Sequence, residues 1–203
     1  MTLSENPAPR RRRVLIVEDD SLVGIGLRAQ LEKLGHEVVG EASTATDAAP
    51  LYLGMQPDVV LMDIRLRGID GIELARQLLQ QRRCPMVILS AFSENQMIER
   101  ASAVGVFGYL IKPVSAQSLQ AQIEVAVSRF EEHEKVLAEK AELTQLLETR
   151  KLVEKAKGIF MKRLGLDEAE AHRRLQMESQ KRRISLSELA KKIIESEDIF
   201  GNA

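Results

Sequence analysis

The sequence lacks tryptophan and has a single cysteine, Cys84. One cysteine cannot form an intramolecular disulfide, so a reducing, cytoplasmic compartment is expected. Its position before Pro85 is more typical of a small buried apolar residue than of a nucleophile. No apolar run approaches the ~18 residues that a membrane helix needs, so no contact with a membrane is expected. The formal net charge of -1 gives no overall bias toward nucleic acid, and any nucleic-acid surface must be local.

What the chain does contain is ordinary for a globular protein, with 44% hydrophobic and 29% charged residues. The composition of the N-terminal segment differs from this average. Residues 1–12 carry Pro7, Pro9 and the start of an arginine run, which is typical of a disordered basic tail.

Short apolar runs then alternate with stretches of helical periodicity. Runs without polar alternation indicate strands that are buried on both faces, as in a parallel sheet. The expected strands are 14–17, 37–42, 59–63, 86–90 and 107–111. Expected helices cover 22–34, 44–55, 71–81, 93–104 and the segment from about 115. Five such repeats predict an α/β fold with a doubly wound, five-stranded parallel sheet.

Chemically active side chains follow the predicted strands. Because the carboxyl ends of parallel strands gather at one edge of a sheet, we expect these groups to lie together. They are Glu18, Asp19, Asp63, Ser90 and Lys112. Taken alone, Asp63 could be a residue that merely starts the next turn. As a group, the carboxylates would repel one another, so they need a cation.

The residue types at this edge indicate which cation and which substrate. Oxygen ligands without His or Cys favour Mg²⁺, which binds one or two carboxylates together with phosphate oxygens. Lys112 offers a positive charge and Ser90 a hydrogen-bond donor for an incoming anion. Asp63 is a carboxylate that can form an acyl phosphate.

The motifs at these strand ends resemble those of response-regulator receiver domains, over about residues 13–130. They are Val17-Glu18-Asp19-Asp20, Met62-Asp63-Ile64-Arg65, Leu89-Ser90-Ala91 and Tyr109-Leu110-Ile111-Lys112-Pro113. The resemblance implies a flavodoxin-like sheet with strand order 2-1-3-4-5. It also implies that a sensor histidine kinase phosphorylates Asp63.

The resemblance assigns further roles around Asp63. Glu18 and Asp19 form the acidic pocket, and the Mg²⁺ ligands include Asp19, Asp63 and the backbone carbonyl of Arg65. Ser90 and Lys112 bind the phosphoryl group, and Tyr109 is the rotating aromatic switch; the alternative for Tyr109 is a plain buried aromatic residue. The chain departs from the family at Leu66-Arg67-Gly68, where Met-Pro-Gly is usual.

From Leu119 until Gly158 is reached, the chain contains neither proline nor glycine. We interpret residues 119–150 as a connecting helix and a candidate coiled coil between two copies of the chain. Val136, Leu143, Leu146 and Val153 fit one heptad phase, whereas Phe130, Leu137 and Thr144 fit another. A break that folds the helix back is the alternative.

Residues 148–203 are expected to form a small unit of three helices. The first ends near Leu164, the second begins after Asp167 and reaches about Ser179, and the third is capped by Ser185 or Ser187. Between residues 150 and 192 there are thirteen Lys and Arg against six Asp and Glu. This local excess is typical of a phosphate-backbone binder, although a solvated surface is the plainer alternative. Candidate RNA contacts are Lys151, Lys157, Lys162, Arg163, Lys181, Arg182 and Arg183.

The same segment resembles the ANTAR domains of RNA-binding transcription antiterminators. Ala156-Lys157-Gly158 with Met161, the turn Gly165-Leu166-Asp167-Glu168 and Leu189-Ala190 carry the resemblance. It implies binding to hairpins of nascent transcripts through their loops, because the A-form major groove is too narrow for side chains. No nucleophile–base pair or metal-ligand cluster is evident in residues 148–203, so an enzymatic output is not expected.

Together these features predict a two-component response regulator. Phosphorylation at Asp63 would control homodimerisation and RNA binding, and so transcription antitermination. Two alternatives stay open on the sequence alone. The C-terminal helices could form a DNA-binding domain, or the chain could act by dimerising, without a nucleic-acid ligand.

Overall fold

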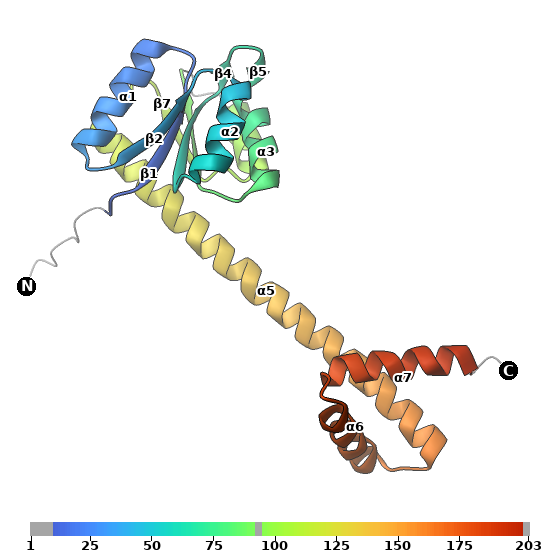
Figure 1. The fold of residues 1–203 in the computed structure, drawn as a ribbon. Helices are drawn as coiled ribbons and strands as arrows, with labels where there is room; N and C mark the ends of the chain where they lie inside the picture. Colours follow the sequence, from blue (N-terminus) through green and yellow to red (C-terminus); the bar gives the residue numbers. More distant parts are fainter. Residues whose placement is uncertain (1–9, 92–94, 201–203) are drawn as a thin grey trace, which may run out of the picture. The chain divides into compact units, whose positions relative to one another are not determined.

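A computed structural model describes residues 10–91 and 95–200 of the chain (Figure 1). Residues 1–9 of the expected tail, Ser93 and the last three residues of the C-terminal segment lie outside the described part. The chain divides into two compact units, Met1–Glu134 and Lys135–Ala203. Among the described residues, no helix is long and apolar enough to span a membrane.

The first unit contains a five-stranded sheet whose order is β2-β1-β3-β6-β7. Every neighbouring pair is parallel, which confirms the predicted topology. The strands are β1 (Arg13–Val17), β2 (Glu37–Ala42), β3 (Val59–Asp63), β6 (Met86–Ser90) and β7 (Gly108–Ile111). All five residues of β3 and of β6 are buried, as unbroken apolar runs require when helices cover both faces of a sheet.

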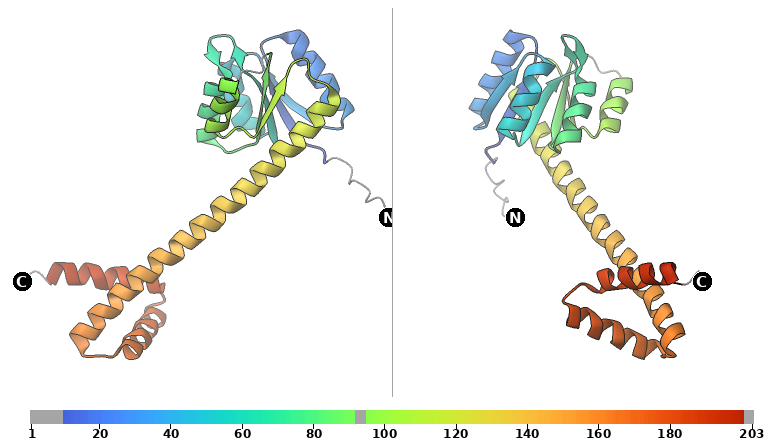
Figure 2. Two further views of the ribbon diagram at one scale, coloured as in Figure 1. Left: turned by 180° about the vertical axis from the view of Figure 1, so that it is seen from behind. Right: turned by 45° about the vertical axis from the view of Figure 1, so that its right-hand side comes forward.

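Helices cover the two faces of the sheet in separate groups (Figure 2). On one face, α1 (Ser21–Lys33) and the beginning of α5 (Ala116–Leu164) bury Leu27, Leu31, Leu119 and Ile123 against β1, β3 and β6. The other face is covered by α2 (Ala45–Met55), α3 (Gly71–Gln81) and α4 (Asn95–Val104). Because all five strands are parallel, this arrangement gathers their carboxyl ends at one edge of the sheet.

A small hairpin beyond β3 was not expected from the sequence. Strands β4 (Arg65–Leu66) and β5 (Ile69–Asp70) pair in antiparallel fashion. Gly68 in the turn has φ +87°, a conformation that glycine adopts readily. Two-residue strands are too short to show an alternating pattern, so only the contacts of the folded chain reveal them.

The long helix α5 corrects the expected division of the chain into elements. The connecting helix 119–150, the last receiver helix and the first helix of the C-terminal segment are one continuous helix, Ala116–Leu164. Gly158 lies within it, and a Cβ at that position would meet nothing within 4 Å. The helix ends where expected, with Gly165 at φ +66°.

The second unit joins the end of α5 to α6 (Glu168–Arg182) and α7 (Leu186–Phe200). Asp167 and Glu170 form a reciprocal capping box at the start of α6. The backbone N–H of Glu188 donates to Ser185 Oγ at 3.1 Å, so Ser185 caps α7. A small core holds the three helices together; it contains Val153, Ala156, Leu175, Leu189 and Ala190.

Candidate functional site

Three carboxylates meet at the carboxyl edge of the sheet. Glu18 and Asp19 follow β1, and Asp63 is the last residue of β3. The N–H of Glu18 donates to the carbonyl of Ala42 at 2.9 Å, which fixes the chain as it leaves the sheet. One oxygen of each carboxylate lies within 4.8 Å of the others. Glu18 and Asp63 are buried, so the sheet brings together the acids that the sequence predicted.

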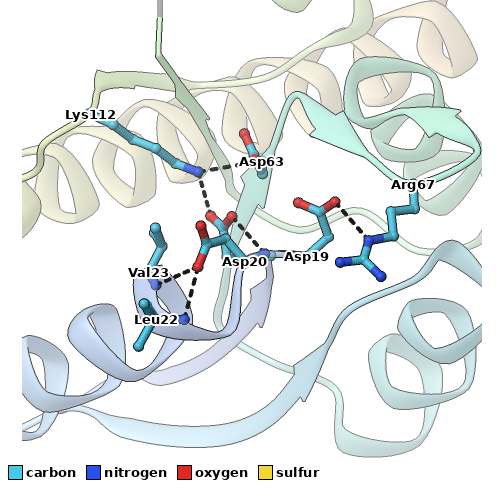
Figure 3. Close-up of polar contacts among 8 residues, drawn as sticks. Asp19, Asp20, Leu22, Val23, Asp63, Arg67 and Lys112 are labelled. Carbon is cyan, nitrogen blue, oxygen red and sulfur yellow. Dashed lines mark hydrogen bonds and ion pairs between the residues drawn. The ribbon is translucent and has the colours of Figure 1, made fainter.

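Lys112 links two of these acids (Figure 3). Its Nζ lies 2.6 Å from Glu18 Oε2 and 3.0 Å from Asp63 Oδ2. The N–H of Lys112 donates to the carbonyl of Ser90 at 2.7 Å, which extends the pairing of β6 with β7 past the end of the strand. The lysine is therefore placed by the same sheet that places Asp63.

The charges at this site do not balance, because three carboxylates face only Lys112 and the exposed side chain of Arg67, whose Nε lies 3.5 Å from Asp19 Oδ2. Burial raises the pKa of Glu18 above 4.5, and the nearby charge of Asp63 acts in the same direction; the hydrogen bond from Lys112 opposes both. Burial alone would lower the pKa of Lys112, but its bonds to Glu18 and Asp63 outweigh this, and its pKa is raised. The site is thus a negatively charged cluster of side chains, in which Lys112 stays protonated at neutral pH. Hard divalent cations bind oxygen ligands of this type.

Asp20, the third acid of the motif after β1, has a different role. Its side chain accepts hydrogen bonds from the backbone N–H of Leu22 at 2.9 Å and of Val23 at 3.3 Å, and so caps α1. Figure 3 shows this carboxylate turned toward the helix. Only Glu18 and Asp19 of this run therefore belong to the acidic cluster with Asp63.

Two of the remaining predicted residues, Ser90 and Arg65, lie at this edge, and the third, Tyr109, lies within β7. Ser90 ends β6 and is buried. Tyr109 lies on β7 opposite Ile88, is half-buried, and packs against the core on the side of α2, α3 and α4. Arg65 begins the β4–β5 hairpin immediately after β3. The structure thus places Ser90 at the carboxyl end of β6 and Arg65 just beyond that of β3, whereas Tyr109 lies within the sheet, two residues before the end of β7.

Two residues near the site were missed as functional candidates. Arg67, noted only as a departure from the family pattern, has its Nε 3.5 Å from Asp19 Oδ2, and its side chain is 81% exposed. Gly71 begins α3 where the helix passes close to β3. A Cβ on Gly71 would lie 1.8 Å from the carbonyl oxygen of Asp63, so no other residue fits without movement of the backbone. No local sequence signal marks this contact between two segments.

The candidate RNA contacts of the second unit differ in exposure. Lys157 is the exception among them, because its side chain is only 9% exposed and its Nζ lies 2.9 Å from Glu154 Oε2 and 2.8 Å from Glu168 Oε1. The bond to Glu168, and then that to Glu154, raise the pKa of Lys157. The others are exposed: Lys151, Lys162, Arg163, Lys181, Arg182 and Arg183.

Two of the exposed arginines also have partners within the unit. Arg163 Nε lies 2.6 Å from Glu197 Oε2, and Arg182 Nε lies 3.3 Å from Glu178 Oε2. Arg183 ends α6 in the left-handed conformation, with φ 55°.

Comparison with known proteins identifies both parts of the chain. The model of the response regulator receiver domain matches residues 14–124, and that of the ANTAR domain matches residues 141–194. The signal receiver domain of a modulated diguanylate cyclase from Desulfovibrio desulfuricans G20 is 36% identical in sequence. It has a TM-score of 0.57, covering 61% of this chain and 99% of that one.

Two further relatives support the assignment. The receiver domain of the putative response regulator NarL from Mycobacterium tuberculosis is 27% identical, with a TM-score of 0.56 over 59% of this chain and 98% of that one. The transcriptional regulatory protein PdtaR of Mycobacterium tuberculosis is 40% identical over 185 residues, which are 91% of this chain and 90% of PdtaR. The chain is therefore a two-component response regulator with an N-terminal receiver domain and a C-terminal ANTAR domain, and it belongs to a family of regulators rather than of enzymes.

Proposed function

We propose that this response regulator is an RNA-binding transcription antiterminator that is switched on by phosphorylation at Asp63. The observation that carries the proposal is the position of Asp63, 3.0 Å from Lys112 Nζ inside an acidic cluster, in a chain that also contains an ANTAR domain. The relative PdtaR is named a transcriptional regulatory protein, which supports an output at transcription.

The acidic cluster fits a magnesium ion. Glu18, Asp19, Asp63 and the backbone carbonyl of Arg65 would hold it, since all supply oxygen and the three carboxylates already lie within 4.8 Å of one another. When bound, Mg²⁺ neutralises carboxylate charge and phosphoryl oxygens. Without such a cation, only Lys112 and the exposed, weakly paired Arg67 oppose the three negative charges.

Asp63 is the phosphoacceptor in this account. A carboxylate oxygen of Asp63 attacks the phosphorus of a phosphohistidine on a cytoplasmic sensor kinase, and the histidine nitrogen leaves as the acyl phosphate forms. Lys112 Nζ, which is 3.0 Å from Asp63, is close enough to pair with the new phosphoryl oxygens. The Ser90 hydroxyl ends the neighbouring strand and supplies a second donor.

The added phosphate changes the contacts of β7 and α4. If Ser90 and Lys112 turn toward the phosphoryl group, Tyr109 and the helix α4 can repack against the same core. Arg100 of α4 bonds Asp70 Oδ2 at 2.5 Å, and Asp70 caps α3, so movement of α4 reaches the loop beside Asp63. Tyr109 is in this way the proposed switch residue.

The output step requires two copies of the chain. Val136, Leu143, Leu146 and Leu147 are each 58–61% exposed on α5, and four large apolar residues within twelve positions need a partner. A second copy of α5 in a coiled coil is the simplest one. Two ANTAR domains in one dimer would then bind two hairpins of one transcript, each raising the effective concentration of the other.

The proposed RNA surface consists of the exposed cations and leaves out Lys157, whose charge is already used by Glu154 and Glu168. Gel-shift competition tests the function directly. With beryllofluoride and Mg²⁺ present, hairpin RNA should displace a labelled hairpin, and duplex DNA of equal length should not. Equal displacement by duplex DNA would favour a DNA-binding regulator, and no shift at all would favour a dimerising module without nucleic acid.

A further inference from the structure

The ANTAR domain contains a groove between its three helices that the proposed function has not yet used. It has a volume of about 370 Å³, at the lower end of the range for ligand pockets. The end of α5, the last turns of α6 and the middle of α7 line it. Its lining combines one aromatic ring with several cations, which is the combination that proteins use for single-stranded nucleic acid.

The floor of the groove is apolar and continuous with the core of the unit. Phe160 and Ile193 are half-buried and pack against this core, and the buried Leu189 also lines the groove. By sequence, Phe160 is one of two aromatic rings of Phe, Tyr or Trp type in residues 135–203; the other is Phe200. Because Phe160 lines the groove, part of its ring is available to a planar ligand.

The rim of the groove is positive. Arg174, Arg182 and Lys192 face a single acid in the lining, Glu178. The guanidinium of Arg174 has no ion pair or hydrogen bond with any side chain that the structure describes. Arg182 is paired with Glu178 and Lys192 with Glu188, but both are exposed pairs four residues apart on a helix. Such pairs contribute little, so a phosphate can displace them.

We propose that this groove receives an unpaired nucleotide of an RNA loop, with its base against Phe160 and its flanking phosphates on Arg174, Arg182 and Lys192. The inference rests on the proposed RNA-binding function and specifies where the loop is read. Loop bases are unstacked and can be placed on aromatic rings or arginine planes. An acidic peptide would satisfy the cations, but it would leave the Phe160 ring without a stacking partner.

Neighbouring residues on α6 provide a matched pair of variants. Arg173 and Arg174 are both exposed arginines, but only Arg174 lines the groove. Arg173→Ala and Arg174→Ala therefore remove the same charge from adjacent positions. Phe160→Leu removes the ring and keeps an apolar residue in the floor. Melting temperatures of all variants show whether the unit stays folded.

The experiment uses the full chain with Mg²⁺ and beryllofluoride, and a labelled pool of RNA hairpins with a common stem and a randomised loop. A second pool has the same stem with abasic loop positions. We expect Arg174→Ala to weaken binding to the first pool about tenfold and Arg173→Ala no more than about twofold. We expect Phe160→Leu to weaken binding to the first pool about tenfold and to leave binding to the abasic pool unchanged.

The possible outcomes distinguish a failure of the groove proposal from a failure of the proposed RNA-binding function. Equal losses for Arg173→Ala and Arg174→Ala, with tight binding by the wild type, would overturn the groove and leave the RNA-binding function standing. A wild type that does not bind the hairpin pool at all would overturn both. Release of the RNA by polyglutamate as efficiently as by unlabelled hairpins would overturn the groove in favour of an acidic peptide. If Phe160→Leu unfolds the unit, the comparison of Arg173→Ala with Arg174→Ala tests the groove by itself.

Discussion

The position of Asp63 depends on Gly71, because only a residue without a Cβ fits beside its carbonyl group. The helix α3 begins so close to β3 that Gly71 N–H donates to the carbonyl of Ile64 at 2.7 Å. The same approach leaves no room for a Cβ beside the carbonyl of Asp63. The position of Asp63 at the end of β3 is thus restrained by the backbone of Gly71.

Replacement of Gly71 should be costly for both stability and phosphorylation. We expect Gly71→Ala to lower the free energy of unfolding by about 1–3 kcal/mol, because the new methyl group forces the backbone of Asp63 to move. Gly54→Ala is the control, since a Cβ there would meet nothing within 4 Å and alanine favours a helix by roughly 0.5–1 kcal/mol. Urea unfolding measures the free energy of unfolding of both variants and of the wild type. Equal stability would show that α3 does not press on Asp63.

Arg67 occupies the place of the usual proline and brings a positive charge to Asp19. A cation in the proposed magnesium site would need this carboxylate, so Arg67 would compete with Mg²⁺ for it. The exposed pair at 3.5 Å is weak. We expect Arg67→Ala to tighten Mg²⁺ binding about two- to fivefold, as measured by titration calorimetry. Arg76→Ala, which removes an exposed charge paired with Glu73, should leave the affinity unchanged. If Arg67→Ala bound Mg²⁺ with the affinity of the wild type, Arg67 would have no influence on the proposed metal site.

The lone thiol should behave as a buried apolar group. Cys84 Sγ donates to the carbonyl of Pro57 at 3.3 Å, and burial raises the pKa of Cys84 from 9.0 to about 11. At pH 8 the thiolate fraction is then about a hundredfold lower than in the unfolded chain, and the thiolate is the reactive form. We expect a thiol reagent at pH 8 to label Cys84 only as fast as the chain unfolds, and reactivity to rise above pH 10. Immediate labelling of the native protein would be inconsistent with this environment.

At the scale of elements, the helix α5 is shared by both units. Its exposed apolar residues fit one heptad phase through Val136, Leu143 and Leu146, and another phase through Leu137 and Thr144 was open on the sequence. Of the four large exposed apolar side chains between residues 136 and 147, three belong to the first phase: Val136, Leu143 and Leu146. The second phase offers one exposed apolar side chain, Leu147, together with the half-buried Leu137 and the hydroxyl of Thr144, which bonds the backbone of Lys140.

Two substitutions on α5 distinguish these phases. We expect Leu143→Glu to abolish the dimer of the activated protein, because two carboxylates would face each other in the seam. Thr144→Glu, one residue further, should leave most of the dimer intact. Sedimentation of each variant in the presence of beryllofluoride measures the fraction of dimer. Loss of the dimer in Thr144→Glu alone would assign the seam to the other phase.

The sequence predicted the central strands β1, β3 and β6 well because they contain unbroken apolar runs, and the acids that follow Val14–Val17 and Val59–Met62 stand out against them. Other elements depend on contacts that no local pattern records. The β4–β5 hairpin is too short to detect, and the close approach of Gly71 to Asp63 joins two separate segments. Charge counting included Lys157 because its partner Glu168 lies across a turn, on the next helix.

At the scale of the whole molecule, the proposed account links the acidic edge of the receiver domain to RNA binding by the ANTAR domain. The link requires that an extra phosphate at Asp63 be stabilised by Lys112 and that dimerisation of α5 follow. Each domain is assigned by its own match, but the coupling between them is what the proposal adds.

Light scattering and RNA binding, measured on the same samples with and without beryllofluoride and Mg²⁺, test this coupling most directly. For the wild type, the account predicts that beryllofluoride doubles the mass and tightens binding to a two-hairpin RNA by about tenfold or more. Asp63→Asn should show neither change. An increase in mass and affinity in Asp63→Asn equal to that of the wild type, or RNA binding that ignores beryllofluoride in both proteins, would contradict control through Asp63.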